Sequence, residues 1–362
     1  MEINYLISVI IPVFNAERFI KTAIESVLQQ HVNWIELIMV NDGSNDSSRD
    51  ICESYQCDHV QVITTQNLGA GHARNTGIQK AKGRWILFLD SDDLLAFSFS
   101  ERFSPAYWDE MERRQVDIVY CPKLTCDYSL LEKPLITFPE DVRSIRHFMP
   151  HMEFWTCLYR RQFILDKHVT FFEYKKQDIE SAFRFRAFSR TSHLYIETHK
   201  LFYIHRNNPG SNVNTWKLKD VYEIKSKVYF ALFKESEYVD KETRRWLLTE
   251  SMFYTKELLL QQNHDIVKAN SFVLQSELPQ YALKDLQLVH LQGRYRLFFF
   301  ALQLLKRSGT ARKLFYMLKR NSRKTPEKAK TSDAEVAWDN TEEIICRLAK
   351  SERTIEIICR EE

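Results

Sequence analysis

Nine residues, from Trp85 to Asp93, constrain the fold of this chain more than any other stretch. Five apolar residues run from Trp85 to Leu89, too few for a helix, and they indicate a strand that is buried on both faces. Carboxylates follow at once, at Asp90, Asp92 and Asp93. Ligands of open α/β sheets bind beyond the carboxyl ends of the strands, so this acidic turn is a candidate site.

The acidic turn, Asp90 to Asp93, also predicts a metal ion. Crowded carboxylates resist ionisation unless a cation lies among them, and hard divalent ions prefer such oxygen ligands. We therefore expect Mn²⁺ or Mg²⁺ here, and the metal would in turn hold a phosphate. The alternative is that Asp90 or Asp92 only caps the next helix, but a cap needs one acid and this turn has three.

The chain before the acidic turn alternates strands and helices. Near-continuous apolar runs predict buried strands, and apolar residues at helical spacing predict amphipathic helices. Strand, helix, strand, helix with short connections predicts a doubly wound parallel sheet. The expected strands are 6–12, 35–40, 60–63 and 85–89, and the expected helices are 17–29, 47–56 and one that follows the glycine-bearing loop 67–71 and ends at 81.

The pattern loosens after the acidic turn. From residue 216 onward the chain has the pattern of helices, which places a domain boundary near residue 215. The further strands expected are 116–121, 135–138 and 200–204, a helix is expected to begin near 179, and the apolar core of the late helices is expected to include Trp246, Leu247, Phe253, Leu258 and Leu259.

Two common nucleotide-binding motifs fit this sequence poorly. In a dinucleotide-binding loop, Gly69 and Gly71 would be followed by a third glycine, but Arg74 stands there. The first strand is followed by Pro12-Val13-Phe14-Asn15, which contains no glycine, and no G-x-x-x-x-G-K-S/T loop occurs. A Rossmann oxidoreductase and a P-loop enzyme are therefore not expected.

The bulk composition is that of a globular chain. Hydrophobic residues make up 44% of its 362 residues, and the formal net charge of +3 is too small to imply nucleic acid. Seven scattered cysteines lack zinc-site spacing and indicate reduced thiols. No apolar run approaches the roughly 18 residues of a membrane span, and no basic, apolar leader precedes the first strand. We expect a cytoplasmic protein.

Four stretches, in this order, resemble the family 2 glycosyltransferases of the GT-A fold. They are Ser8-Val-Ile-Ile-Pro-Val-Phe-Asn15, Val40-Asn-Asp-Gly-Ser44, Asn67-x-Gly-x-Gly-x-x-x-Arg74-Asn75-x-Gly77 and Gly83-x-x-Ile86-x-Phe88-Leu-Asp-Ser-Asp-Asp93. Each motif alone is weak, but four in register with their strands are specific. The resemblance covers about residues 6 to 215.

The resemblance implies an α/β fold of the GT-A class, a doubly wound mixed sheet, to which the late helices add a C-terminal appendage. Residues 1–215 would form the catalytic domain, 216–320 a helical region and 321–362 a linker and tail. Members of the family move a sugar from a nucleotide diphosphate to an acceptor hydroxyl, with inversion at the anomeric carbon.

Carried onto matching positions, the resemblance assigns a donor site. Phe14 would offer a stacking face to the base, without the hydroxyl of the Tyr found in family members. Asp42 would hydrogen-bond the base, and Arg74 would lie near the base and diphosphate. Taken singly, Asp42 is typical of a turn and Arg74 of a solvated helix. The nucleotide-sugar-binding residues so expected are Pro12, Val13, Phe14, Asn15, Asp42, Asn67, Arg74, Asp90, Ser91, Arg206 and Ser211.

The resemblance also assigns the chemistry. Asp92 would ligate the metal and His205 would complete its ligands, although a lone histidine is as often structural. An acceptor hydroxyl is a poor nucleophile, so a carboxylate must take its proton. Gln177-Asp178 matches the family's Glu-Asp, which makes Asp178 the expected base; the alternative is a helix N-cap. The departure at Gln177 removes a carboxylate beside the acceptor pocket and leaves acceptor binding open.

The basic late segment suggests a surface role. Residues 294–330 hold twelve Lys or Arg and one acid, interleaved with aromatic and aliphatic residues. Such helices can lie in the headgroup layer at the inner face of a plasma membrane, which suits a lipid-linked acceptor. The alternative is packing on the catalytic domain with solvated charges outside. Nucleic acid is not expected, since no recognised module accompanies the charge; a homo-oligomer through the tail stays open.

These inferences favour a metal-dependent, inverting glycosyltransferase that extends a surface glycan from a nucleotide-diphosphate sugar, most simply a UDP-sugar. A rival of another class is a non-catalytic subunit that binds a sugar nucleotide or a glycan. Such a subunit has no reason to keep both Asp92 and Asp178. A nucleotidyltransferase is a second rival, but it would carry a glycine-rich basic loop after the first strand.

Overall fold

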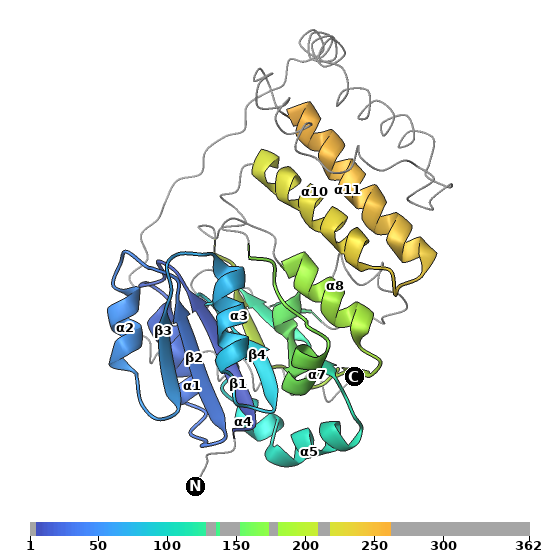
Figure 1. Cartoon of the computed structure of the whole chain (residues 1–362). Coiled ribbons are helices and arrows are strands. Elements are labelled where there is room, and N and C mark those ends of the chain that lie inside the picture. The colour runs from blue at the N-terminus through green and yellow to red at the C-terminus, as the bar shows by residue number, and fades with distance from the viewer. Residues whose placement is uncertain (1–4, 128–134, 138–152, 174–179, 209–217, 262–362) are drawn as a thin grey trace, which may run out of the picture. The chain divides into compact units, whose positions relative to one another are not determined.

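The computed structural model describes residues 5–127, 135–137, 153–173, 180–208 and 218–261 (Figure 1). These residues fall into two compact units, one ending before residue 215 and the other beginning there. Each unit is described by itself. The catalytic role of the first unit and the boundaries of the linker and tail stay predictions.

The first unit is built on a seven-stranded sheet with the order β10-β6-β9-β4-β1-β2-β3. All of these pairings are parallel except those of β9, which runs antiparallel to both β4 and β6. The sheet is therefore mixed, as expected. Its strands are β1 (Ile7–Val13), β2 (Ile35–Asn41), β3 (Val60–Thr64), β4 (Trp85–Phe88), β6 (Ile118–Tyr120), β9 (Cys157–Arg160) and β10 (Leu194–Ile196).

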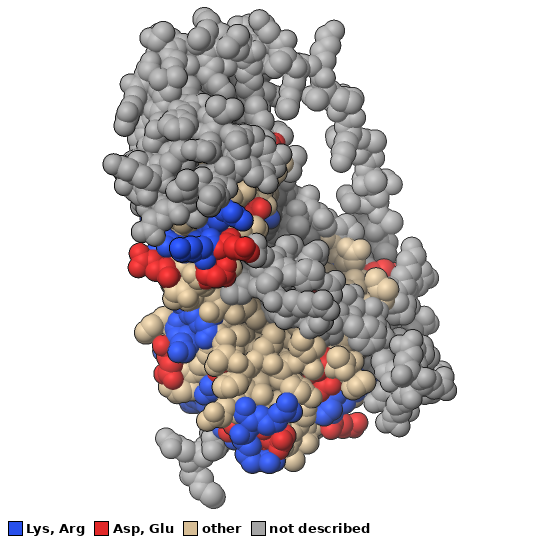
Figure 2. Space-filling view, turned by 90° about the vertical axis from the view of Figure 1, so that its right-hand side faces the viewer, with Lys and Arg blue, Asp and Glu red and all other residues tan. Residues whose placement is uncertain are grey.

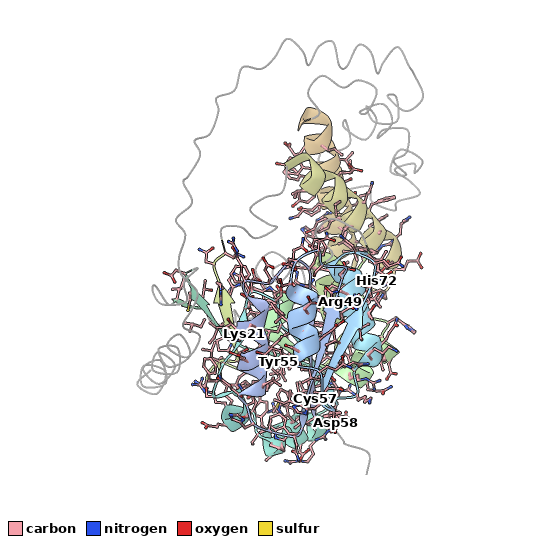
Figure 3. All side chains as sticks on the ribbon, turned by 90° about the vertical axis from the view of Figure 1, so that its left-hand side faces the viewer. Lys21, Arg49, Tyr55, Cys57, Asp58 and His72 are labelled. Atoms are coloured by element: carbon pink, nitrogen blue, oxygen red, sulfur yellow. The ribbon has the colours of Figure 1, made fainter. Side chains whose placement is uncertain are left out.

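Helices cover the two faces of this sheet in a way that the strand order dictates. The chain steps from β1 to β2 to β3 in one direction, and then returns past β1 to β4. Right-handed crossovers therefore place α1 and α2 on one face and α3 on the other. In Figure 3, Lys21 of α1 and His72 of α3 lie on opposite sides of the strands. The helices of the first unit are α1 (Ile20–Leu28), α2 (Ser48–Ser54), α3 (Ala70–Lys80), α4 (Phe99–Arg102), α5 (Pro105–Arg113), α7 (Arg161–Asp166) and α8 (Glu180–Arg190), with a 3₁₀ turn, η1 (Phe154–Thr156).

A second, four-stranded sheet follows the acidic turn, with the order β5-β11-β7-β8. β11 pairs with β5 in antiparallel register, so that Ile204 lies opposite Leu94. This pairing brings His205 next to Asp93 although they are far apart in the chain. The strands are β5 (Leu94–Leu95), β7 (Lys123–Cys126), β8 (Leu135–Thr137) and β11 (Tyr203–Arg206).

The sequence pattern does not predict β7 or β9. Each has four residues, which is too short to show a clear alternation of polar and apolar positions. β9 is nevertheless central, because it joins β4 to β6. The strands and helices expected before the acidic turn are confirmed, with ends that differ by a few residues.

Aromatic rings fill the core behind the acidic turn. Phe88, the last residue of β4, is fully buried and meets Phe154 and Phe171 edge-on or tilted, with ring centroids 5.6 and 5.3 Å away. Phe171 stacks on Phe183 of α8 with centroids 4.1 Å apart. This cluster fixes the end of β4 to the segment around residue 171.

The turn before β4 is built around the buried carboxylate of Glu36. Its Oε1 accepts hydrogen bonds from Ser8 Oγ at 2.6 Å and from the backbone N–H groups of Lys82 and Gly83 at 2.6 and 2.9 Å. Residue 83 has no room for a side chain, because a Cβ there would lie 2.5 Å from the backbone nitrogen of Ser8. The turn is thus bonded to both neighbouring strands.

The second unit contains two long helices, α10 (Leu218–Glu235) and α11 (Lys241–Gln261), which confirms the expected helices after residue 216. Tyr229 of α10 stacks on Tyr254 of α11, and Ser251 Oγ donates to the carbonyl of Ser226 at 2.9 Å. Of the residues expected in the helical core, Leu247 and Leu258 are buried, whereas Trp246 and Phe253 are only half-buried. The basic segment 294–330 and the tail lie outside the described residues. No helix in the described ranges is both long and apolar enough to cross a bilayer.

We expect Gly83→Ala to destabilise the first unit by roughly 2 kcal/mol or more, because the new methyl group meets backbone atoms that cannot move independently. Urea unfolding followed by the fluorescence of the buried Trp85 and Trp108 would measure it. Lys82→Ala is the matched control, since that side chain is exposed. Equal unfolding midpoints for the two variants would contradict the packing argument.

Candidate active site

The four sequence motifs converge at one end of the seven-stranded sheet. In the parallel register, Val13 lies beside Asn41 and Ile10 beside Phe88, so β1, β2 and β4 end near one another. The segments that follow these strands begin at Phe14, Asp42 and Leu89. The expected donor-binding residues before Ser91 therefore come together at the carboxyl edge, where α/β sheets bind ligands.

Side chains join the loops after β1 and β2. The backbone N–H of Asn15 donates to Ser44 Oγ at 3.1 Å, and the N–H of Asn45 donates to Asn15 Oδ1 at 2.9 Å. Ala16 N–H also donates to Ser48 Oγ at 2.7 Å. These bonds leave the ring of Phe14 42% exposed, as a stacking surface for a base requires.

Asp42 organises the glycine-bearing loop. Its carboxylate is 3% exposed and accepts hydrogen bonds from Thr65 Oγ1 at 2.8 Å and from the N–H groups of Leu68 and Gly69 at 2.8 and 2.6 Å. Asp42 therefore holds the start of α3 and the neighbouring Asn67, which has a positive φ of 47°. The expected contact of Asp42 with a base stays a prediction beside this structural role.

Buried Arg74 and partly exposed Asp90 form an ion pair. Arg74 Nη2 lies 2.6 Å from Asp90 Oδ1, and the side chain of Arg74 is 5% exposed. The guanidinium carbon lies 4.6 Å from the ring centroid of Phe154, a favourable cation–π distance. The pair links α3 to the end of β4, so Arg74 is a fixed cation at the carboxyl edge and not a solvated helix charge.

Asp92 is the least compensated carboxylate of the acidic turn. Among the described side chains, only Asn208 donates a hydrogen bond to it, from Nδ2 at 3.0 Å. Burial, followed by the neighbouring charges of Asp93 and Asp90, raises the pKa of Asp92 to about 6. A cation placed beside Asp92 would relieve this surplus of negative charge.

Asp93 faces the second sheet. It is 2% exposed and accepts hydrogen bonds from Tyr203 Oη at 2.6 Å and from the N–H of Arg206 at 2.8 Å. His205 Nδ1 lies 3.2 Å from both of its carboxylate oxygens. Burial alone would lower the pKa of His205, but the contact with Asp93 outweighs it and raises that pKa. Asp93 is thus a structural acid that sequence reasoning did not separate from its neighbours.

The geometry of this end fits a metal held jointly with a phosphate. Within the described part of the chain, no cluster of three or more His, Cys, Asp or Glu side chains is placed to enclose a metal ion. Mg²⁺-type sites commonly use one or two carboxylates and complete their coordination with water and substrate phosphates. Asp92 fits that role because its charge is poorly compensated. Protonation of His205, which Asp93 favours, would compete with metal binding.

The remaining predicted residues are placed as follows. Ser91 is half-buried in the acidic turn, and Pro12 and Val13 form the end of β1. Arg206 is 1% exposed, and its guanidinium lies 5.1 Å from the ring centroid of Phe19. The predicted base Asp178 and the predicted donor contact Ser211 lie outside the described residues.

Asn75 holds the chain that leads toward Asp178. Its side chain pairs with the backbone of Phe171 in both directions, accepting from the N–H at 2.9 Å and donating to the carbonyl at 3.0 Å. It also donates to Glu173 Oε1 at 3.1 Å, and His72 Nδ1 lies 3.2 Å from Glu173 Oε2. The bond from Asn75 is the main reason that the pKa of Glu173 is lowered. Sequence reasoning gave no role to Asn75, although it stands in the motif with Arg74.

We expect Asp92→Asn to stabilise the metal-free protein at pH 8 by roughly 1–2 kcal/mol. The pKa of Asp92 is raised in the folded state, so its ionised form opposes folding above pH 6, and this penalty fades as the pH falls toward 4. Unfolding midpoints at several pH values, measured with a chelator, would check it. Asp46→Asn is the control and should destabilise the protein at pH 8. Burial raises the pKa of Asp46, but hydrogen bonds from Ser48 outweigh burial and lower that pKa, so its ionised form favours folding.

Asn75→Ala should destabilise the first unit by roughly 2–3 kcal/mol, because it leaves the buried N–H and carbonyl of Phe171 without partners. His72→Ala removes one contact from the same helix to a carboxylate that is 54% exposed, and it should change stability by less than about 1 kcal/mol. Thermal unfolding of the two variants gives the comparison. A larger loss in the His72 variant would refute the role given to Asn75.

Comparisons with known proteins agree with this geometry. The profile of the family described as Glycosyl transferase family 2 matches residues 8–187. An uncharacterized glycosyltransferase of Bacillus subtilis (strain 168), EpsJ, is 34% identical over 221 residues, which is 57% of this chain and 62% of EpsJ. The minor teichoic acid biosynthesis protein GgaB of the same strain is 40% identical over 124 residues, 33% of this chain and 14% of GgaB. The chain thus spans less than two thirds of either relative.

Solved structures show the same fold. TarS of S. aureus, residues 1–349, superposes with a TM-score of 0.54 at 19% identity, covering 87% of this chain and 90% of that one. At this identity the likeness shows the fold alone, and it confirms the predicted GT-A class. The family profile runs through the strands and loops that form the site, and this chain belongs to glycosyl transferase family 2.

Proposed function

We propose that this chain transfers a sugar from a nucleotide-diphosphate sugar, of the UDP class, to a hydroxyl of a glycan or lipid-linked acceptor. The observation that carries the proposal is the convergence of Asp42, the Arg74–Asp90 pair and Asp92 at the carboxyl ends of β1, β2 and β4. The family of the chain supports it, as does the neighbour TarS, which has been solved in complex with UDP-GlcNAc. The related GgaB acts in teichoic acid biosynthesis, which favours a cell-surface polymer as product.

Each residue has a physical task in this proposal. Phe14 offers a ring to the base, and the loop that Asp42 holds lines the nucleotide. Asp90, fixed by Arg74, faces the ribose side of the donor. Asp92, with His205 when that ring is neutral, would hold Mn²⁺ or Mg²⁺, which supplies positive charge to the diphosphate leaving group.

The acceptor side rests on Asp178, five residues after Glu173. Asp178 takes the proton of the acceptor hydroxyl as that oxygen attacks the anomeric carbon, and the bond to the diphosphate breaks. A single displacement of this kind inverts the anomeric centre. The contacts of Asn75 with Phe171 and of His72 with Glu173 fix the chain shortly before Asp178, the proposed catalytic base.

A nucleotide-release screen tests the proposal. The purified chain would be incubated with Mn²⁺ or Mg²⁺ and UDP-, GDP- and dTDP-sugars, with glycan and lipid-linked acceptors added. We expect metal-dependent release from one donor, with losses of 100-fold or more in Asp92→Ala and Asp178→Ala. Asp58→Ala, an exposed acid marked in Figure 3, is the control and should keep full activity.

The outcomes separate the rival functions. Tight, metal-dependent binding of a donor without turnover would favour a non-catalytic subunit that binds the sugar nucleotide. Loss of donor binding in Asp92→Ala, with binding retained in Asp178→Ala, would support the separate roles given to the two acids. Absence of binding by every donor would refute the assignment of the carboxyl edge.

A further inference from the structure

The opposite edge of the seven-stranded sheet carries a pocket of about 610 Å³. It is formed where β4, β6 and β10 begin and where β9, which runs antiparallel, ends. We call it the amino-edge pocket. It is lined by Lys82, Gly83, Arg84, Glu112, Gln115, Asp117, Arg160, Arg161, Gln162, Phe163, Asp166, Lys167, Ser192 and His193. The donor site lies at the carboxyl ends of the parallel strands, so the two sites are at opposite ends of the sheet.

Cations outnumber acids in the amino-edge pocket. Five Lys or Arg residues line it against three Asp or Glu residues. Figure 2 shows Lys and Arg side chains gathered with acids near the bottom of a face whose centre is largely uncharged. The excess charge alone does not make a site, because exposed cations are usually solvated. The arrangement of the ion pairs is more informative.

Two of the five cations are held by carboxylates. Arg84 donates to Glu112 Oε2 at 2.7 Å and to Asp109 Oδ1 at 3.0 Å, which fixes it to α5. Arg160 is paired with Asp117, which also accepts from Thr191 Oγ1 at 3.1 Å. These pairs neutralise the carboxylates of Glu112 and Asp117 and hold the side chains of Arg84 and Arg160 in the wall of the pocket.

The other three cations are not held in this way. Over the ranges that the structure describes, no carboxylate pairs with the ammonium groups of Lys82 and Lys167 or with the guanidinium of Arg161. The Nε atom of Arg161 is buried and has no hydrogen-bond partner among those residues. The third acid of the lining, Asp166, accepts from Gln162 Nε2 at 2.7 Å. A buried donor without a partner is unfavourable unless a ligand or water satisfies it.

The backbone that carries these cations is fixed before any ligand arrives. Glu36 holds the N–H groups of Lys82 and Gly83, and Arg161 N–H donates to the carbonyl of Arg84 at 2.8 Å. Arg190 donates to the carbonyl of Lys167 at 2.7 Å. The backbone of the pocket is therefore preorganised, while the exposed side chains of Lys82 and Lys167 become ordered only when an anion binds.

We propose that the amino-edge pocket binds a phosphate-bearing anion, with Arg161, Lys167 and Lys82 as its ligands. Arginine and lysine are the usual phosphate partners, and the volume lies within the range of small-molecule sites, larger than one phosphate group needs. The anion is a phosphate group on a larger polar molecule, either a small phosphorylated compound or a phosphodiester polymer. This site is separate from the proposed sugar transfer and does not depend on it.

Titration calorimetry of the full chain tests this proposal, with pyrophosphate and a long-chain polyphosphate as probes. A chelator is present throughout, so that the donor site, where phosphate binding is expected to need a metal ion, does not contribute. We expect both probes to bind, and the double variant Arg161→Gln/Lys167→Gln to weaken binding at least tenfold. The control Lys21→Gln/Arg49→Gln removes two exposed cations from α1 and α2, marked in Figure 3, and should leave the affinity unchanged.

A gain of affinity provides a second test that misfolding could not mimic. Asp166→Asn removes the acid closest in sequence to Lys167 and should tighten binding of both probes severalfold. The two probes are compared by their affinity per phosphate group. A much higher value for polyphosphate would identify a polymer as the ligand, and equal values would identify a small compound. Failure of both probes to bind, or equal affinity in the double variant and the control, would overturn the proposal.

Discussion

The ion pair between Arg74 and Asp90 is the interaction on which the proposed site depends. The guanidinium of Arg74 lies against the rings of Phe154 and Phe171 and is buried, whereas Asp90 is partly exposed, so it is the arginine that most requires its partner. Such a pair adds little net stability, but removing Asp90 would leave the buried guanidinium of Arg74 without its carboxylate, which is unfavourable. Its consequence is geometric: it locks α3, which carries the glycine-bearing loop, to the end of the central strand β4. The glycine-bearing loop and the acidic turn are thereby held in a fixed relative position.

The three carboxylates of the acidic turn differ through their partners, not through their identity. Asp90 is neutralised by a guanidinium, and Asp93 is satisfied by a tyrosine, a backbone N–H and a histidine. Among the described side chains only the amide of Asn208 donates to Asp92, which leaves it the carboxylate that gains most from a cation. A turn with three acids therefore presents one available charge. The same environment opposes folding of the metal-free protein, as is common where a site is built for a ligand.

The sequence alone predicted the parallel strands and the helices between them, because buried strands and amphipathic helices have clear hydrophobic patterns. It also placed the acidic turn at the carboxyl edge, where ligands of parallel sheets bind, whereas the position of Arg74 near that edge was implied by the family resemblance. It did not show that Asp93 would meet Tyr203 and His205, because that contact depends on the pairing of β5 with β11 across more than a hundred residues. Nor did it show the role of Asn75, whose partner is backbone and has no side-chain signature.

A sheet with mostly parallel strands has two ends, and in this protein they differ in charge: acids gather at the carboxyl edge and cations outnumber acids in the amino-edge pocket. At the carboxyl edge, acids such as Asp92 would face the proposed donor, so a phosphate could be held there only with a cation between the two. At the amino edge, cations such as Arg161 and Lys167 face the pocket directly. Phosphate binding at the first edge should therefore depend on the metal, whereas binding at the second should depend on ionic strength. The two sites can thus be occupied independently, because neither uses a charge that the other needs.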